Sequence, residues 1–128
     1  MLEELYQEHI MEHYKNPKNK GIITNADIDY QEVNQLCGDE IHLTLTITNG
    51  KIATIKFEGK GCAISQSAAS LMTEYLKGKT LTQAKKLAQE DVTKQLGVNV
   101  GPGRIKCATL IIKALHRGIY LYEQRRKP

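Results

Sequence analysis

Polar and apolar residues alternate without interruption along residues 41–48, which read Ile-His-Leu-Thr-Leu-Thr-Ile-Thr. A period of two is typical of a β-strand with one buried face. The dipeptide Asn49-Gly50 follows directly, and this pair favours a tight hairpin turn. Residues 51–58 are therefore expected to return as the second strand of an antiparallel hairpin, and a weaker strand is expected around residues 30–35. The buried side of the return strand is expected to carry Ala53, Ile55 and Phe57.

Apolar residues at intervals of three and four predict helices on both sides of this hairpin. The expected helices cover residues 2–14, 63–77, 80–83 and beyond, 91–96 and 105–124. Thr80 and Gln83 have the spacing of a capping box, in which each side chain bonds the backbone of the other residue. The sequence predicts an α+β fold, with a small antiparallel sheet of about three strands, helices packed on one face, and a long C-terminal helix. The length of 128 residues suits one domain, residues 1–128.

The composition indicates a protein of the cell interior. No apolar run approaches the roughly 20 residues that a membrane-spanning helix requires. The N-terminus carries glutamates at positions 3 and 4 and lacks the basic-then-apolar order of a secretion signal. A cytoplasmic protein without membrane contact is therefore expected. The chain has three cysteines, and an odd number in a reducing compartment argues against a disulfide framework and for metal binding or catalysis.

The net charge of +4 comes largely from two basic groups. These groups are Arg125, Arg126 and Lys127 at the C-terminus, and Lys85 with Lys86. Basic patches can bind nucleic acid, but the chain has one phenylalanine and no tryptophan, so aromatic platforms for single strands are scarce. We therefore expect no nucleic-acid partner and assign these charges to a solvated or partner-facing surface.

The cysteines all border predicted turns. Cys37 stands in Cys-Gly-Asp, two residues before Asp39 and the first strand of the hairpin; Cys62 follows a glycine-punctuated turn before a helix; and Cys107 opens the last helix. Thiolates are the nucleophiles and metal ligands among thiol species, and helix N-termini stabilise them. Three thiolates and one oxygen donor suit zinc or an iron–sulfur cluster. The pattern indicates a metal or cluster site, although a free cysteine is commonly a small buried hydrophobe.

Asp39 as fourth ligand has a consequence for how the site would be used. A carboxylate is a harder ligand than a thiolate, so its bond to a soft cluster is expected to be labile. Such a site suits a cargo that is assembled and then handed on.

Several stretches of this sequence resemble the IscU/SufU/NifU N-terminal family of iron–sulfur cluster assembly proteins. Five of them match in order: residues 14–19 (YKNPKN), 37–39 (CGD), 57–65 (FEGKGCAIS), 67–73 (SAASLMT) and 104–110 (RIKCATL). The resemblance implies that an Fe–S cluster or zinc is bound by Cys37, Asp39, Cys62 and Cys107. It also implies a pyridoxal-phosphate cysteine desulfurase as sulfur donor and apo Fe–S proteins as recipients.

Departures from the family pattern leave two mechanisms open. IscU proteins have a histidine where this chain has Lys106, and a chaperone-recognised Leu-Pro-Pro-Val-Lys segment where residues 99–103 read Asn-Val-Gly-Pro-Gly, which argues against handover to that heat-shock chaperone. The stretch around Lys106 is similar to SufU, yet the longer SufU insertion is missing. The first mechanism is a non-enzymatic scaffold that builds a transient [2Fe–2S] cluster from sulfur accepted on Cys107 or Cys62. The second is a zinc-dependent sulfur carrier, a sulfurtransferase that activates the desulfurase.

Two further hypotheses about the function are a thiol enzyme and a structural zinc module. A thiol enzyme would need a histidine base, and no histidine stands near Cys62 or Cys107 in the sequence. A structural zinc module would bind metal without accepting sulfur. The oligomeric state, including a homodimer, stays open.

Overall fold

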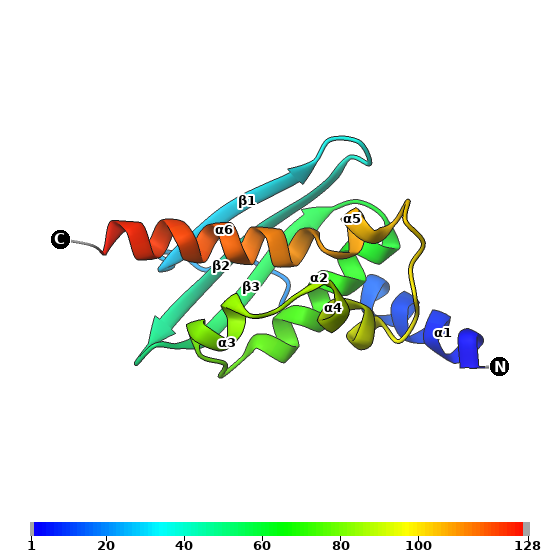
Figure 1. Cartoon of the computed structure of the whole chain (residues 1–128), viewed down its shortest axis with the longest axis horizontal. Coiled ribbons are helices and arrows are strands. Elements are labelled where there is room, and N and C mark those ends of the chain that lie inside the picture. Colours follow the sequence, from blue (N-terminus) through cyan, green and yellow to red (C-terminus); the bar gives the residue numbers. More distant parts are fainter. Residues whose placement is uncertain (1, 127–128) are drawn as a thin grey trace.

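The computed structural model describes the backbone of residues 2–126 and the side chains of residues 7–126. Along the chain the elements are α1 (Leu2–Lys15), β1 (Ile28–Asn34), β2 (Asp39–Thr48), β3 (Lys51–Lys60), α2 (Ala63–Leu76), α3 (Leu81–Lys85), α4 (Gln89–Leu96), α5 (Ile105–Ala108) and α6 (Leu110–Arg125). The predicted α+β class with a three-stranded sheet and a long C-terminal helix is confirmed (Figure 1).

The sheet is antiparallel throughout, in the order β1-β2-β3. Leu43 sits at its centre, paired with Tyr30 on β1 and with Phe57 on β3. Leu43 and Phe57 are buried, as expected for the apolar positions of an alternating strand. The predicted hairpin is therefore confirmed, and the weaker strand occupies Ile28–Asn34, two residues earlier at its start than predicted.

The buried face of β3 departs from the prediction at one position. Thr46 pairs with Thr54, and Ile47 pairs with Ile52, so Ala53 is an extra residue in the ladder. Such a bulge shifts the alternation of side chains by one residue. Ile52 is consequently buried while Ala53 is exposed, and the expectation that Ala53 shares a face with Ile55 and Phe57 is wrong.

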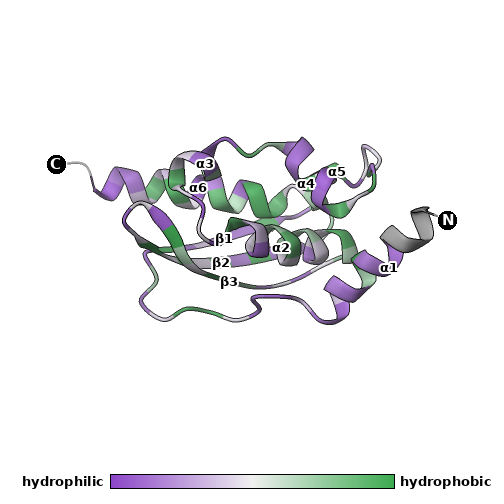
Figure 2. Cartoon of the chain, turned by 90° about the horizontal axis from the view of Figure 1, so that it is seen from below, coloured by the Kyte–Doolittle hydropathy of each residue, from purple (hydrophilic) through white to green (hydrophobic). Residues whose placement is uncertain are grey.

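Helices cover one face of the sheet, as predicted. α6 lies against β1 and β2, and α2 lies against β3 (Figures 1 and 2). Gly118 permits a close approach of α6, because a Cβ there would come within 2.7 Å of Ile28 Cγ2. The opposite face is crossed by the connection between α1 and β1, in which Ile23 N donates to Thr44 Oγ1 at 3.0 Å.

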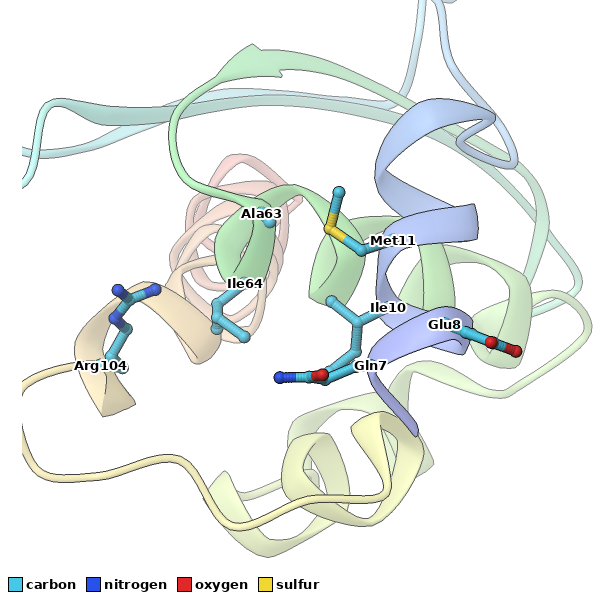
Figure 3. A pocket seen from close by; sticks show the side chains of 7 residues that line it. All are labelled: Gln7, Glu8, Ile10, Met11, Ala63, Ile64 and Arg104. Carbon is cyan, nitrogen blue, oxygen red and sulfur yellow. The ribbon is translucent and has the colours of Figure 1, made fainter. Parts of the chain in front are cut away.

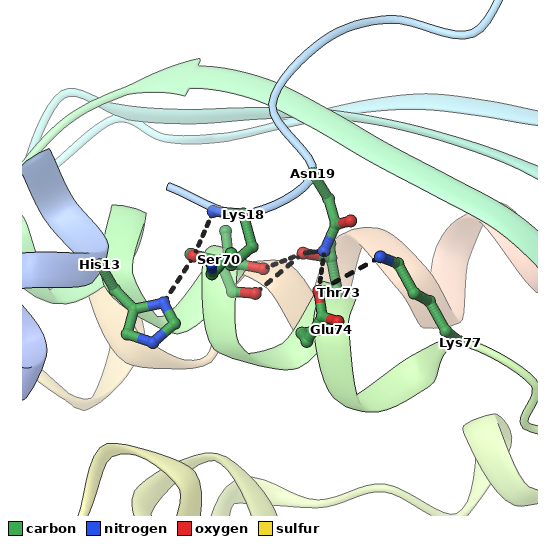
Figure 4. Close-up of polar contacts among 8 residues, drawn as sticks. His13, Lys18, Asn19, Ser70, Thr73, Glu74 and Lys77 are labelled. Carbon is green, nitrogen blue, oxygen red and sulfur yellow. Dashed lines mark hydrogen bonds and ion pairs between the residues drawn. The ribbon is translucent and has the colours of Figure 1, made fainter. Parts of the chain in front are cut away.

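Serines on α2 attach α1 and its following loop. Ser67 Oγ donates to the backbone oxygen of Ile10 at 2.6 Å. Ser70 Oγ accepts from Lys18 N at 2.8 Å and lies 2.7 Å from His13 Nδ1 (Figure 4). Ser67 and Ser70 therefore fasten α1 and the loop after it to α2.

The second half of the chain corrects two helix boundaries. Thr80 and Gln83 form the predicted capping box of α3, but α4 begins at Gln89, two residues before the predicted start. The expected continuous helix over residues 105–124 is interrupted at Thr109 and forms α5 and α6. Thr109 Oγ1 donates to Ile105 O at 2.8 Å, and such bonding of a threonine to the carbonyl four residues earlier bends helices.

The basic C-terminus is partly used in packing, because Arg125 Nη2 donates to Asp27 O at 3.2 Å. Lys127 lies outside the described residues, as do the side chains of Leu2, Leu5 and Tyr6 on the first helix. Among the helices of residues 2–126, none combines the length and apolarity needed to cross a bilayer.

Candidate metal centre

The segments that carry the cysteines meet at the end of the molecule remote from the C-terminus (Figure 1). The β1–β2 turn carries Cys37, which is exposed. Asn34 O closes this turn by accepting from Cys37 N at 3.3 Å and from Gly38 N at 2.9 Å. Gly38 has φ +72°, a left-handed conformation that glycine adopts without strain. The turn therefore presents Cys37 directly before the first residue of β2.

Asp39 begins β2 and is completely buried. Its Oδ1 accepts a hydrogen bond from Cys62 N at 2.9 Å. Its Oδ2 has no hydrogen-bond partner within the described part of the chain. A buried carboxylate oxygen without a donor is unfavourable, so this atom is suited to a cation that is bound between the same elements.

Gly61 lets the β3–α2 connection lie against this carboxylate. It has φ +144°, and a Cβ there would collide with the Asp39 carboxylate and approach Ser65 Oγ to 2.9 Å. Only glycine fits this combination of backbone conformation and close approach. The glycine-punctuated turn seen in the sequence therefore positions Cys62 against Asp39.

Cys107 lies within α5, with its Sγ 3.4 Å from Cys37 Sγ. It is 3% exposed. Burial raises the pKa of the Cys107 thiol, and the neighbouring Asp39 carboxylate and Cys37 thiol act in the same direction. The sequence places Cys107 at a helix start, which favours the thiolate, but α5 has only four residues and the burial of Cys107 acts in the opposite direction.

Cys62 is the N-cap residue of α2 and is half-buried. Its Sγ accepts a hydrogen bond from Ser65 N at 3.5 Å, so the amides of the helix start do reach this sulfur. Donor atoms of three residues lie within 4.8 Å of one another, those of Cys37, Asp39 and Cys107. The structure therefore brings three of the four candidate residues together and places Cys62 beside them, linked through its backbone to Asp39.

These donors fit a thiophilic metal ion. A tetrahedral zinc with bonds of about 2.3 Å would hold two sulfurs about 3.8 Å apart, close to the 3.4 Å separation seen here. The partnerless Asp39 Oδ2 supplies a third donor. Cys62, whose backbone N donates to Asp39 Oδ1, is the candidate for a fourth. No histidine belongs to the group formed by the described residues.

An open cleft of about 640 Å³ adjoins the site between α1, α2 and the segment before α5 (Figure 3). Its lining includes Met11 and Ile64 as apolar walls and Arg104 at its edge. Ala63 also lines it and directly follows Cys62. The cleft therefore extends to the residue next to Cys62.

One residue near the centre was not singled out in the sequence. Asn34 pairs directly with Asp39 across β1 and β2, and its Nδ2 is buried without a partner among the described residues. Its only signal in the sequence is its place at the end of the weaker strand, shortly before Cys37. The pairing that brings it beside Asp39 is visible only in the structure.

Comparison with known proteins gives a consistent result. The NifU-like N-terminal domain family matches residues 5–128. A zinc-dependent sulfurtransferase SufU from Bacillus subtilis is 39% identical, over 92% of this chain and 91% of the relative. The iron–sulfur cluster assembly scaffold protein IscU 1 from Archaeoglobus fulgidus is 33% identical, over 92% of this chain and 76% of the relative.

Solved structures agree with these sequence relatives. A crystal structure described as a SUF-system cluster assembly scaffold from Fervidobacterium islandicum is 32% identical with a TM-score of 0.73, covering 88% of this chain and 94% of that one. The alignment with the Bacillus relative runs over 135 positions, more than this chain's 128 residues, whereas the Archaeoglobus alignment runs over 118. The Bacillus protein therefore has residues without a counterpart here. The chain belongs to the NifU-like N-terminal domain family of iron–sulfur cluster assembly scaffolds, which includes IscU- and SufU-type proteins.

Proposed function

We propose that this protein accepts sulfur from a cysteine desulfurase and assembles a transient [2Fe–2S] cluster on Cys37, Asp39, Cys62 and Cys107. The observation that carries the proposal is the buried Asp39 Oδ2, which has no partner among the described residues and lies with two thiol sulfurs 3.4 Å apart. Soft sulfur donors suit iron in clusters, and the carboxylate completes the set.

Cys62 is the sulfur acceptor that this geometry favours. It is half-buried, whereas Cys107 is buried and its pKa is raised by that burial. The Cys62 thiolate attacks the outer sulfur of a desulfurase persulfide, the S–S bond of the donor breaks, and the donor cysteine leaves as a thiolate. The cleft next to Ala63 gives the donor a path to this position.

Assembly and release then follow from the donor set. Reduction of two accepted sulfurs to sulfide takes four electrons: two ferrous ions supply two as they become ferric, and a thiol reductant supplies the other two. The cysteines would hold the resulting cluster, and the harder Asp39 carboxylate is the ligand expected to exchange first. An apo Fe–S protein with a further thiolate can therefore displace Asp39 and take the cluster.

A second candidate function is favoured by the 39% identity to a zinc-dependent sulfurtransferase. In that case zinc occupies the same residues, and docking of the desulfurase frees one thiolate to carry sulfur away. Both functions use one site, so they differ in the resident metal and in what the protein delivers.

The deciding experiment mixes the protein with a cysteine desulfurase, cysteine and a thiol reductant, with and without ferrous iron. Before the reductant is added, intact-mass measurement of the Cys37→Ser, Cys62→Ser and Cys107→Ser variants shows which of them can still gain sulfur. The scaffold function predicts sulfur on Cys62 and, with iron, a visible absorption band with two irons and two sulfides per site. Sulfur uptake without a cluster supports the carrier. Failure of every cysteine to gain sulfur overturns both.

A further inference from the structure

Two buried side-chain atoms within the described residues have no hydrogen-bond partner, and they belong to directly paired residues. They are Asp39 Oδ2 and Asn34 Nδ2, and Asn34 is the β1 partner of Asp39 on β2. Directly opposed residues of an antiparallel pair place their side chains on the same face of the sheet. Both atoms therefore lie on one face, at the end of the sheet that carries Cys37.

One of these atoms is an acceptor and the other is a donor, yet they make no bond with each other. Neighbouring buried groups of opposite kind would normally satisfy one another, because an unmade hydrogen bond in the interior is costly. Each atom instead stays available for a third group. Asp39 Oδ2 suits a cation, and Asn34 Nδ2 suits an electron-rich atom that arrives together with that cation.

The position of Asn34 on β1 shows that its side chain belongs to the row that faces the helices. Ile28, Tyr30, Glu32 and Asn34 alternate with exposed residues along β1, so they form its inward row. Glu32 on this row contacts Arg117 of α6 at 2.7 Å. Further toward the start of β1, Ile28 lies beneath Gly118.

Lys113 near the start of α6 also pairs with Glu32, whereas Arg125 at its end bonds Asp27 O just before β1, so α6 runs opposite to β1 (Figure 1). The beginning of α6, which follows directly after α5 and Cys107, therefore lies toward the Asn34 end of the strand. The backbone oxygen of Asn34 also closes the turn that holds Cys37. Asn34 is thus placed among the segments that carry three of the candidate ligands.

We propose that Asn34 donates a hydrogen bond from Nδ2 to a metal-bound thiolate sulfur when the site is loaded, and thereby positions that ligand and stabilises its charge. A thiolate bound to a metal is the electron-rich atom that enters this space with a cation. Partners of this kind orient metal ligands and typically contribute 10–100-fold, or roughly one to two orders of magnitude, to metal affinity. The inference rests on the metal site of the proposed function and adds a residue to it.

The test uses the whole chain with an Asn34→Leu substitution, which keeps the branched shape of the side chain and removes the donor. Zinc affinity is measured by competition with a chelator, and the sulfur-to-cobalt charge-transfer band is recorded after loading with Co²⁺ alone. Gln35→Leu is the matched control, because Gln35 is the next residue of the same turn and is exposed. Asn34→Ala serves as a second variant in case leucine does not fit.

The proposal predicts zinc binding weaker by roughly 10–100-fold for Asn34→Leu and unchanged for Gln35→Leu. Loss of the hydrogen bond raises the energy of the sulfur lone pair, so the cobalt band moves to longer wavelength. The apoprotein melts no lower than the wild type, because the substitution removes a buried unpaired donor.

Unchanged affinity and an unchanged cobalt band in both Asn34 variants overturn the inference. The inference is also overturned if the Asn34 variants bind zinc more weakly and melt at a lower temperature while their cobalt band does not move, since that result indicates a purely structural role. A wild-type protein that binds neither zinc nor cobalt would overturn the metal site itself, and with it the proposed function.

Discussion

Replacing Asp39 by asparagine separates the requirements of metal binding from those of folding. Asp39 is completely buried, and only one of its two oxygens has a donor among the described residues. Asparagine has the same shape, and its oxygen can still accept from Cys62 N. Its amide group replaces the partnerless Oδ2 and can donate to a neighbouring cysteine sulfur, which is a weak acceptor.

The size of the effect follows from that one atom. Leaving a buried acceptor unsatisfied costs about 1–3 kcal/mol, so the Asp39→Asn apoprotein should be more stable by about that amount. Unfolding entropy is about 2.1 cal/mol/K per residue, which for a chain of 128 residues converts this gain into a melting temperature higher by roughly 4–11 °C. Zinc should stabilise the variant less than the wild type, because one ligand is lost.

The assay is thermal unfolding of both proteins in chelator and again with excess zinc. Asp29→Asn is the control, since Asp29 has an exposed side chain whose partner is His42 on the surface, and its substitution should change the unfolding free energy by no more than about 1 kcal/mol. A lower melting temperature of the Asp39→Asn apoprotein would refute the reasoning. Equal zinc stabilisation of variant and wild type would refute the role of Asp39 as a ligand.

Two other predictions concern the surroundings of the site. Gly61→Ala should destabilise the apoprotein by about 1–3 kcal/mol and weaken zinc binding, because its φ of +144° and the Asp39 carboxylate leave no room for a Cβ. Gly101→Ala is the control, since the space at that position is open, and its melting temperature and its zinc affinity in chelator competition should be nearly unchanged. Equal behaviour of the two variants would contradict the packing argument. Burial lowers the pKa of His13 from its ordinary 6.5, so the unfolded chain binds the proton more readily, and stability present above pH 6.5 should decrease as the pH falls below it. Urea unfolding across pH 5–8 should show this decrease reduced in His13→Gln, and an identical pH profile in that variant would remove His13 as the cause.

The hairpin could be predicted in detail because its signals are local. Strict alternation over residues 41–48 and the Asn49-Gly50 turn determine both strands and their pairing. The bulge at Ala53 could not be predicted, since Ala53 and Ile52 are both compatible with a buried position. Which of the two is buried depends on which one pairs with Ile47 of the partner strand.

The helices show the same division between local and tertiary information. The capping box at Thr80 is a local interaction and was predicted. The interruption at Thr109 depends on its hydroxyl bonding to Ile105 O, and threonine within a helical pattern does not reveal that choice.

The sequence indicated which residues belong to the candidate site, but it did not indicate their burial or the orientation of their side chains. Turn positions and glycines indicated the cysteines and Asp39, and three of the four donors do lie together. The burial of Cys107 and the orientation of Cys62 toward Ser65 N depend on how α2 and α5 pack. Asn34 carries no chemical signal of its own, because only the β1–β2 register places it opposite Asp39.

X-ray absorption spectroscopy of the zinc-loaded protein tests the central claim most directly. Convergence of Cys37, Asp39, Cys62 and Cys107 on one ion predicts a single zinc with three sulfur neighbours at about 2.3 Å and one oxygen at about 2.0–2.2 Å. Cys62→Ser should remove one sulfur from that shell and leave the other two. A wild-type zinc surrounded by oxygen and nitrogen alone, or a shell that Cys62→Ser does not change, would contradict the four-residue centre.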